Sequence, residues 1–299
     1  MSSVRVNPNL ASDLLAGINT VREELNQSDL EIASGKSINT PSDNPGGAAA
    51  LVINLAEQSQ TDTYQANAAD LQTRLQTADS VLGSAVTAIT SAISAGVEAG
   101  NSDLSTDNRD AIANQVAGIQ QQLVSLANTT SGGTYLFSGT LVETQPFALD
   151  SASPSGVTYS GNSGVTSVQL SSGQSLATNL PGSQLFLNPS GNVFQSINQL
   201  ILAIQNNSGI STAVTNLGQA LQEFNSQRQS YGTALNQLQS TGNLLASEQV
   251  QLASQQSNIS AADLPTAVTN FSQSEIAYTS LLEAEGKVLN LPNLLSFLQ

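Results

Sequence analysis

The chain has 299 residues, of which 39% are apolar and 10% charged, and it contains no His, no Cys and no Trp. These absences exclude a Ser-His-Asp triad, a thiolate nucleophile and the usual His and Cys ligands of zinc and haem, so we expect no enzyme activity, no cofactor and no metal. With 7 Lys plus Arg against 22 Asp plus Glu, a net charge of −15, the chain cannot neutralise phosphates as nucleic-acid binding requires.

The N-terminal end is predicted to form an amphipathic helix. Its apolar residues advance by three, four or seven positions and therefore share one helical stripe: Leu10, Leu14, Ile18, Val21, Leu25 and Ile32. The neighbouring sequence contains nothing that would bury this stripe. We therefore expect a partner helix, which comes either from the opposite end of the chain or from a neighbouring subunit.

A turn follows this helix and leads into a second one. Gly35 suits a left-handed helix end, and Pro41 lies in the loop after it. Asp43 or Asn44 suits an N-cap, and Pro45 suits the first position of the next helix. The residue types alone are those of an ordinary helix connection.

Two helices are predicted after this turn. The first runs to about residue 100, and its apolar residues alternate between steps of four and three: Leu71, Leu75, Ala78, Leu82, Ala85, Ile89 and Ala92. After a polar turn, with Ser105 or Thr106 as the N-cap, the second helix carries a shorter series: Ile112, Val116, Ile119, Leu123 and Leu126. The nearby Asp103, Asp107 and Asp110 lack the Gly and the final Glu of a calcium loop, so we expect them to cap the helix.

The sequence changes character between about residues 131 and 192. This stretch is rich in Gly, Ser, Thr and Pro, and short alternating segments such as Val157–Tyr159 and Val165–Leu170 predict brief strands and tight turns. Very few of its residues are charged. We expect residues 136–192 to form a small β-rich outer domain with a small core of its own.

Helical spacing returns in the C-terminal half. One apolar series covers residues 193–204, and a longer one begins after Gly209; if it is continuous for roughly 50 residues, it spans on the order of 75 Å. A final series lies near the C-terminal end: Phe271, Tyr278, Leu281, Val288, Leu291, Leu295 and Leu298. This stripe has the same character as the N-terminal one, so the two ends of the chain can pair.

These patterns predict a mainly α fold: an elongated rod of long helices, with the N- and C-terminal helices paired as a coiled coil and a small β-rich insert. The expected domains are residues 1–44 with 259–299 for the coiled coil, residues 45–135 with 193–258 for the rod, and residues 136–192 for the insert. A hairpin with about 35 residues in each arm buries little apolar surface, so we expect assembly to supply the missing burial.

We find no segment that predicts membrane insertion or a cleaved signal. No run of about eighteen apolar residues is present, so we expect no membrane partner. The first residues lack the apolar core of a secretory signal peptide. The absence of Cys is compatible with the cytoplasm or with export that does not rely on disulfides.

Five segments carry a resemblance to a known family. The segment Ser34–Leu51, SGKSINTPSDNPGGAAAL, resembles the N-terminal signature of the flagellin superfamily. Four more segments resemble the junction subunits of that superfamily, which lie between hook and filament: NTTSGGTYLFSGT with the following QPF, VTYSGNSG, LPGSQLF, and the C-terminal AEGKVLNLPNLLSFL. The resemblance touches both ends and the middle of the chain.

The resemblance implies a structural role in the extracellular part of the bacterial flagellum. It implies a terminal coiled coil that assembles into a tube, and export through the flagellar type III pathway without a cleaved signal. The implied partners are the first hook-associated junction protein, flagellin, copies of the chain in a ring and a cytoplasmic export chaperone. The implied assembly interface comprises Leu10, Leu14, Ile18, Val21, Leu25, Leu281, Val288, Leu295 and Leu298, and the motif turn comprises Gly35, Pro41, Asp43 and Pro45.

Alternative functions remain open. The first is a filament-forming flagellin, which is a bulk polymer and not a junction subunit. The second is a secreted binding or adhesive module that uses the β-rich insert. An enzyme is the most distant alternative, because the chain lacks His, Cys and any clear constellation of carboxylates.

Overall fold

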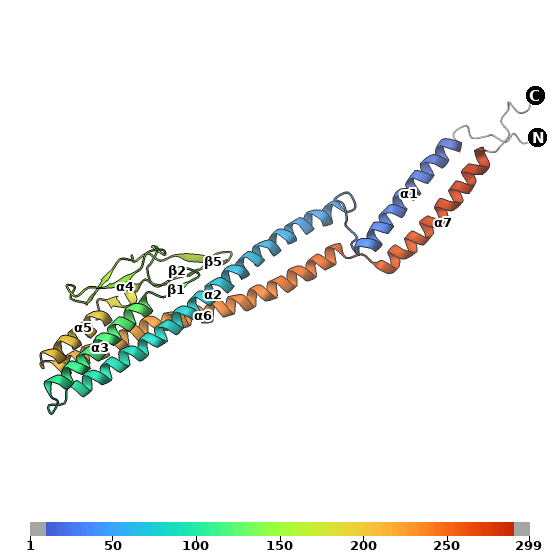
Figure 1. Ribbon diagram of the computed structural model, residues 1–299. Coiled ribbons are helices and arrows are strands. Elements are labelled where there is room, and N and C mark those ends of the chain that lie inside the picture. The colour runs from blue at the N-terminus through green and yellow to red at the C-terminus, as the bar shows by residue number, and fades with distance from the viewer. Residues whose placement is uncertain (1–9, 290–299) are drawn as a thin grey trace, which may run out of the picture. The chain divides into compact units, whose positions relative to one another are not determined.

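The computed structural model describes residues 10–289 (Figure 1). The chain packs as two units, one formed by residues 61–248 and the other by the segments up to residue 60 and from residue 249. We call them the core unit and the terminal unit. The helices are α1 (Leu10–Ser34), α2 (Pro45–Ala99), α3 (Thr106–Ala127), α4 (Gly182–Leu185), α5 (Val193–Gln205), α6 (Ile210–Ser260) and α7 (Leu264–Leu289).

The predicted fold class is confirmed: the protein is mainly α, with long helices and a small β-rich insertion. Helices α2 and α6 have 55 and 51 residues, and each contributes to both units. Local sequence fixes the helix ends as expected. The hydroxyl of Ser105 accepts the Asn108 N–H at 3.2 Å as the N-cap of α3, and Gly209, with a φ of +73°, precedes α6.

The core unit is built around the apolar stripes of α2, α3, α5 and α6. The four-three series of α2 is buried along its length, and side chains of the other helices complete the same cluster. Several of its residues have no exposed surface: Leu82, Ile89, Leu123, Ile197, Leu200 and Leu217. Gly96 allows α2 to approach closely, because a Cβ there would lie 2.7 Å from Val214 and 2.9 Å from Leu200.

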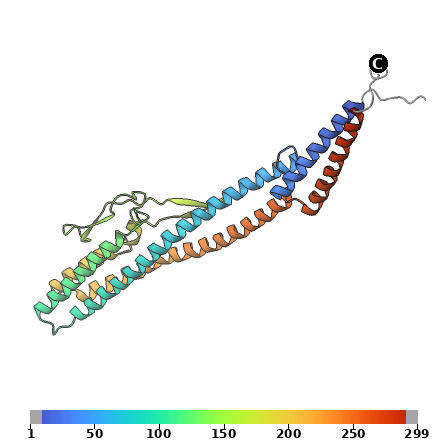
Figure 2. The same cartoon turned by 45° about the vertical axis from the view of Figure 1, so that its right-hand side comes forward.

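The β-rich insertion consists of four antiparallel two-stranded sheets. In chain order they pair β1 (Thr130–Ser131) with β2 (Thr134–Tyr135), β3 (Phe147–Leu149) with β4 (Val157–Tyr159), β5 (Ser167–Ser171) with β6 (Gln174–Ala177), and β7 (Leu187–Asn188) with β8 (Gly191–Asn192). Figure 1 labels β1, β2 and β5, and Figures 1 and 2 both show the strands on one side of the core helices. Each hairpin is too small to be stable alone, so its stability must come from packing.

The expectation that the insert has a core of its own is wrong. The rings of Phe147 and Phe186 lie 5.5 Å apart in the insert, but both contact Phe194 of α5, at 5.3 and 5.6 Å. Phe186 also lies 5.3 Å from Phe224 of α6. In addition, the Leu180 N–H donates to the Tyr231 hydroxyl at 3.2 Å, and burial raises the pKa of that phenol. One continuous aromatic core therefore joins the insert to the helices.

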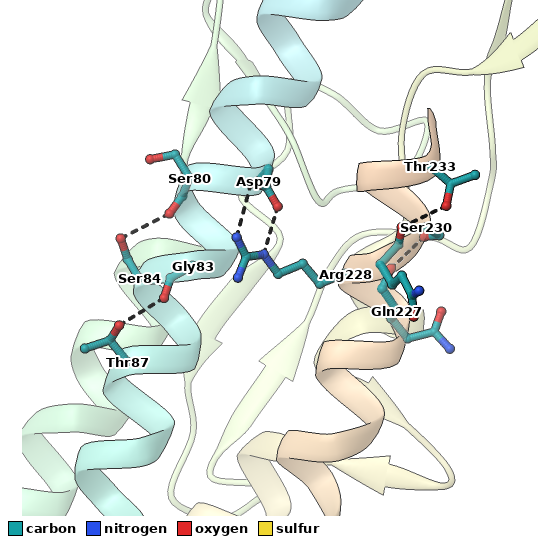
Figure 3. A network of polar contacts seen from close by, with 10 residues as sticks. Asp79, Ser80, Gly83, Ser84, Thr87, Gln227, Arg228, Ser230 and Thr233 are labelled. Atoms are coloured by element: carbon teal, nitrogen blue, oxygen red, sulfur yellow. Dashed lines mark hydrogen bonds and ion pairs between the residues drawn. The ribbon is translucent and has the colours of Figure 1, made fainter. Parts of the chain in front are cut away.

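An ion pair fixes α2 against α6 in the core unit. Arg228 donates from Nε to Asp79 Oδ1 at 2.8 Å and from Nη2 to Oδ2 at 3.1 Å (Figure 3). Gly83 leaves room for this guanidinium, since a Cβ there would lie 3.4 Å from Nη2. Both side chains are about one-third exposed, so the pair contributes at most about 1 kcal/mol, and its bidentate geometry mainly favours one register.

Helix α2 is more apolar than the sequence reading suggested. An 18-residue window of it has a mean hydropathy of 1.5, which meets the length and composition of a membrane span. The expectation of no such segment overlooked the many Ala residues of this helix. In the protein, 39% of the window is buried, and the apolar stripe of α2 packs into the core unit. Core helices with this composition are ordinary, so the window is weak evidence for a membrane.

Candidate assembly surface

Helices α1 and α7 pack against each other in the terminal unit and run in opposite directions. Cδ1 of Leu281 lies 3.8 Å from the place of a Cβ on Gly17, and Lys36 forms an isolated antiparallel bridge with Ala261. The predicted pairing of the terminal helices is therefore observed. An antiparallel pair of amphipathic helices is the arrangement that the two apolar stripes favour.

The structure places most of the predicted interface residues along this helix pair. Ile18 is buried, and five others are half-buried: Leu14, Val21, Leu25, Leu281 and Val288. The side chain of Leu10, together with Leu295 and Leu298, lies outside the part that the structure describes. The role of all nine residues in assembly stays a prediction.

The terminal unit has very little apolar core. Among its described residues, the buried apolar ones are only Ile18, Ile38, Leu252 and Ala267, whereas the core unit buries several dozen. Many large apolar side chains of the terminal unit are instead exposed: Leu15, Leu30, Val52, Ile53, Leu55, Val250, Leu264, Val268, Ile276 and Leu282. A helix pair that buries so few apolar side chains gains little stability from packing within the subunit.

The motif turn has the geometry that its residues predict. Gly35 has a φ of +68° and its N–H donates to Glu31 O at 2.9 Å, which ends α1. Pro41 lies in a turn closed by the Asp43 N–H donating to Thr40 O at 3.1 Å, and Pro45 is the first residue of α2. The residues that were predicted as the turn therefore act together in a single local structure.

Of the two predicted N-caps, Asn44 caps α2, and its Oδ1 accepts the Gly47 N–H at 2.9 Å. Asp43 binds the turn instead. Its Oδ2 accepts the N–H groups of Asn39 at 2.9 Å and Thr40 at 2.7 Å, while Oδ1 accepts the Thr40 hydroxyl at 2.7 Å. The hydrogen bonds from Thr40 and then from Asn39 lower the pKa of Asp43 below its ordinary value.

The turn between α1 and α2 is also hydrogen-bonded to the connection between α6 and α7. The sequence analysis did not predict this contact. The Ser37 N–H donates to Ser260 O at 2.8 Å, and the Ala262 N–H donates to Gly35 O at 3.0 Å. Ile38 is buried beside Gly47, where a Cβ would lie 2.6 Å from its Cδ1. The α1–α2 turn and the α6–α7 joint therefore form one junction. Nothing local in the sequence signals a contact between segments more than 200 residues apart.

The carboxylate of Asp43 should make this turn sensitive to pH. A folded-state pKa below the unfolded value means that Asp43 stabilises the turn above its ordinary pKa and loses this contribution as the pH falls through the lower folded value. In the Asp43→Ala variant, we expect faster amide exchange at Asn39 and Thr40 at neutral pH. Exchange measured by NMR at several pH values should show this difference shrinking in acid; an equal difference at all pH values would contradict the role of the ionised carboxylate.

Two small polar residues lie in the contact between α1 and α7, at positions where the apolar series of these helices would place an apolar side chain. Ser28 continues the four-three series of Val21 and Leu25, and Ser274 continues the seven-residue steps between Ala267 and Leu281. Their exposed fractions are 7% and 8%, so both lie within the helix contact. Sequence reasoning passed over both because it followed only apolar residues. Both residues could have been identified from their positions, because each continues the spacing of the apolar residues in its helix.

Within residues 10–289, no group of three or more His, Cys, Asp or Glu side chains could hold a metal. The expectation that Asp103, Asp107 and Asp110 cap α3 is wrong, because the side chain of Ser105 is the N-cap there. The terminal unit therefore offers surfaces for packing and hydrogen bonding.

Comparison with known proteins identifies the family. The model for the bacterial flagellin N-terminal helical region matches residues 6–141, and the model for the bacterial flagellin C-terminal helical region matches residues 214–298. These two regions of one family together cover most of the chain and include α1, α7 and the motif turn. The chain belongs to the flagellin superfamily.

Two curated relatives narrow the similarity within this superfamily. Flagellar hook-associated protein 3 of Salmonella typhimurium is 32% identical over 173 residues, which cover 58% of this chain and 53% of that protein, so this match spans about half the length of the relative. Flagellar hook-associated protein 3 of Escherichia coli is 26% identical over 296 residues, which cover 90% of this chain and 92% of that protein.

Solved structures support the same fold. A putative flagellar hook-associated protein from Vibrio parahaemolyticus has a TM-score of 0.66 at 20% identity and covers 73% of this chain and 100% of its own. FlgL of Bacillus cereus has a TM-score of 0.57 at 24% identity and covers 70% of this chain and 99% of its own. At these identities the likeness establishes the fold.

Proposed function

We propose that this chain is a structural subunit of the bacterial flagellum that links the hook-associated zone to the flagellin filament through its terminal helices. The observation that carries the proposal is the terminal unit: its described residues bury few apolar side chains and leave many large ones exposed. Such a unit needs other subunits to cover it. The match to hook-associated protein 3 over 92% of the E. coli protein supports a position at the junction.

The proposed partners are a hook-associated protein on the hook side, flagellin on the filament side, and further copies of this chain around a ring. The proposed interface is the stripe from Leu10 to Leu25 in α1 and from Leu281 to Leu298 at the other end of the chain. In the proposed organisation, residues 1–44 with 259–299 form the assembly domain, 45–135 with 193–258 the rod, and 136–192 an outer β-rich part.

The proposed route to the flagellum is the flagellar type III channel, which the chain enters unfolded and without a cleaved signal. A cytoplasmic chaperone would cover the apolar terminal stripes before export. The absence of Cys suits this route, because folding outside the cell then needs no disulfide formation. The function needs no catalytic chemistry, so we propose that the chain is not an enzyme.

The free subunit should open at its terminal unit first. Because α1 and α7 share few buried apolar contacts, we expect their amides to exchange at least about tenfold faster than those of α3 and α5 in the monomer. Hydrogen exchange followed by mass spectrometry, on a monomer verified by sedimentation, measures this directly. Equal protection of residues 276–289 and of α3 would show that the terminal pair is stable without partners.

A filament-forming flagellin is the second candidate, and membership of the same superfamily favours it. A filament needs an axial contact between identical subunits that repeats without limit, whereas a junction subunit meets different proteins above and below. We expect the purified chain to stay monomeric or form short oligomers at micromolar concentration, even with precipitant and filament seeds. Long, regular filaments of this chain alone in electron micrographs would overturn the junction role in favour of flagellin.

A further inference from the structure

One side of the α1–α7 pair is a polar groove of about 510 Å³. Eight residues line it, four from each helix: Glu24, Gln27, Ser28, Glu31, Asn270, Gln273, Ser274 and Ala277. Ser28 and Ser274 are more than nine-tenths buried, and neither hydroxyl has a hydrogen-bond partner among the described residues. Neither hydroxyl oxygen is among the fully buried unpaired atoms of the described residues, so both face the open groove and are free to bond a group that enters it.

The groove is chemically suited to a cation with several donors. Glu24 and Glu31 stand one helical turn on either side of Gln27 and Ser28, and no described Lys or Arg pairs with either carboxylate. Gln27 Nε2 reaches Glu31 Oε1 only at 3.4 Å. Carboxylate, hydroxyl and amide oxygens converge here, and a guanidinium with five N–H donors satisfies more of them than an ammonium does.

The opposite side of the same helix pair presents such a cation. At 100° per residue, Glu24 and Arg22 lie on opposite sides of the seam line of Val21 and Leu25, each about 80° from it. Arg22 is exposed, and no described carboxylate pairs with it. The exposed residues Leu15 of α1 and Leu264, Val268 and Leu282 of α7 fall on this same side by the same spacing.

We propose that these two sides are complementary halves of one contact between copies of this chain, in which Arg22 of one copy enters the groove of the next. The proposal rests on the proposed ring of identical subunits and adds its lateral contact. A polar groove and a basic, apolar face on opposite sides of a helix pair make a head-to-tail contact, which continues around a ring. Gln27 and Ser28 lie about 8 Å along α1 from Arg22, which an extended arginine side chain spans.

Cysteine pairing in the assembled protein tests the contact, because the natural chain contains no Cys. Full-length Arg22→Cys and Gln27→Cys variants are mixed, assembled on hooks from cells that lack this subunit, and oxidised. We expect covalent dimers that join position 22 to position 27, and few dimers from either variant alone. The control pair, Ser280→Cys with Gln27→Cys, should not link. Incorporation without any 22–27 link would overturn the contact and leave the junction role intact.

Charge reversal gives an independent readout. We expect Arg22→Glu, and separately Glu24→Lys with Glu31→Lys, to lower incorporation onto hooks on the order of tenfold, while circular dichroism of each variant stays native. In a mixture of the two variants, every contact between unlike copies again joins opposite charges, so the mixture should recover incorporation well above that of either variant alone. Loss without recovery in the mixture, despite native folding, would overturn the proposal; failure of the natural chain to incorporate would overturn the junction role as well.

Discussion

Replacement of Phe186 by Ala is expected to lower the free energy of unfolding of the core unit by about 3–5 kcal/mol. Phe186 has no exposed surface, and its ring lies within 5.6 Å of the rings of Phe137, Phe147, Phe194 and Phe224. Truncation therefore removes a large apolar group and leaves a cavity between the insert and two helices. Urea unfolding, followed by the helical signal in circular dichroism, measures the loss.

The helical signal decides whether the insert is part of the core. Phe186 lies in the insert, but two of its ring neighbours lie in α5 and α6, so the helices should melt earlier in Phe186→Ala. The matched control is Leu149→Ala in the same insert; Leu149 is 52% exposed, and we expect a change of less than about 1 kcal/mol. Unchanged helical melting in Phe186→Ala would show that the insert is an independent domain after all.

The helices could be predicted from the sequence because their signal is local. The alternation of steps of four and three in α2 states both the helix and its buried face, and Gly35, Asn44, Pro45 and Ser105 lie at the helix ends as capping chemistry requires. The pairing of α1 with α7 also followed from their stripes. Their spacing offered this pairing as one of two possibilities, the other being a helix of a neighbouring subunit.

The shared core of the insert could not be predicted in the same way. Phe147, Phe186 and Phe224 are far apart in the sequence, and together with Phe194 they follow no common period, so only the fold brings the four rings together. The composition of the segment indicated turns and strands correctly but gave no information on what its side chains contact. The junction between Gly35 and Ala262 escaped notice for the same reason, since backbone hydrogen bonds leave no mark on residue type.

The apolar residues of the candidate assembly surface were predicted from the sequence, whereas its polar residues were not. Leu14, Ile18, Val21, Leu25 and Leu281 were found because apolar spacing is visible in the sequence. Ser28 and Ser274 occupy equivalent positions but carry hydroxyls, and a search for apolar stripes ignores them. Their burial and their lack of partners become evident only when α1 and α7 lie together.

Replacement of Leu281 by Asp is expected to impair assembly strongly while leaving the core unit folded. Leu281 is half-buried in the α1–α7 contact, where its Cδ1 packs against Gly17. A carboxylate at this position must be desolvated or must force the helices apart, at a cost of several kcal/mol in the assembled state. Since 1.4 kcal/mol corresponds to a factor of ten, we expect incorporation onto hooks to fall by at least about tenfold.

The neighbouring residue supplies the control for charge alone. Ser280 is exposed, and Ser280→Asp adds the same carboxylate one position away, outside the helix contact. We expect Ser280→Asp to incorporate within about threefold of the natural chain, because an exposed charge in the rim of a contact costs little. Immunogold labelling of hooks counts the incorporated subunits, and urea unfolding of both variants reports on the core unit. Equal incorporation of Leu281→Asp and Ser280→Asp would contradict the prediction. A charge within the α1–α7 contact would then have no effect on assembly, so the terminal helix pair would play no part in it.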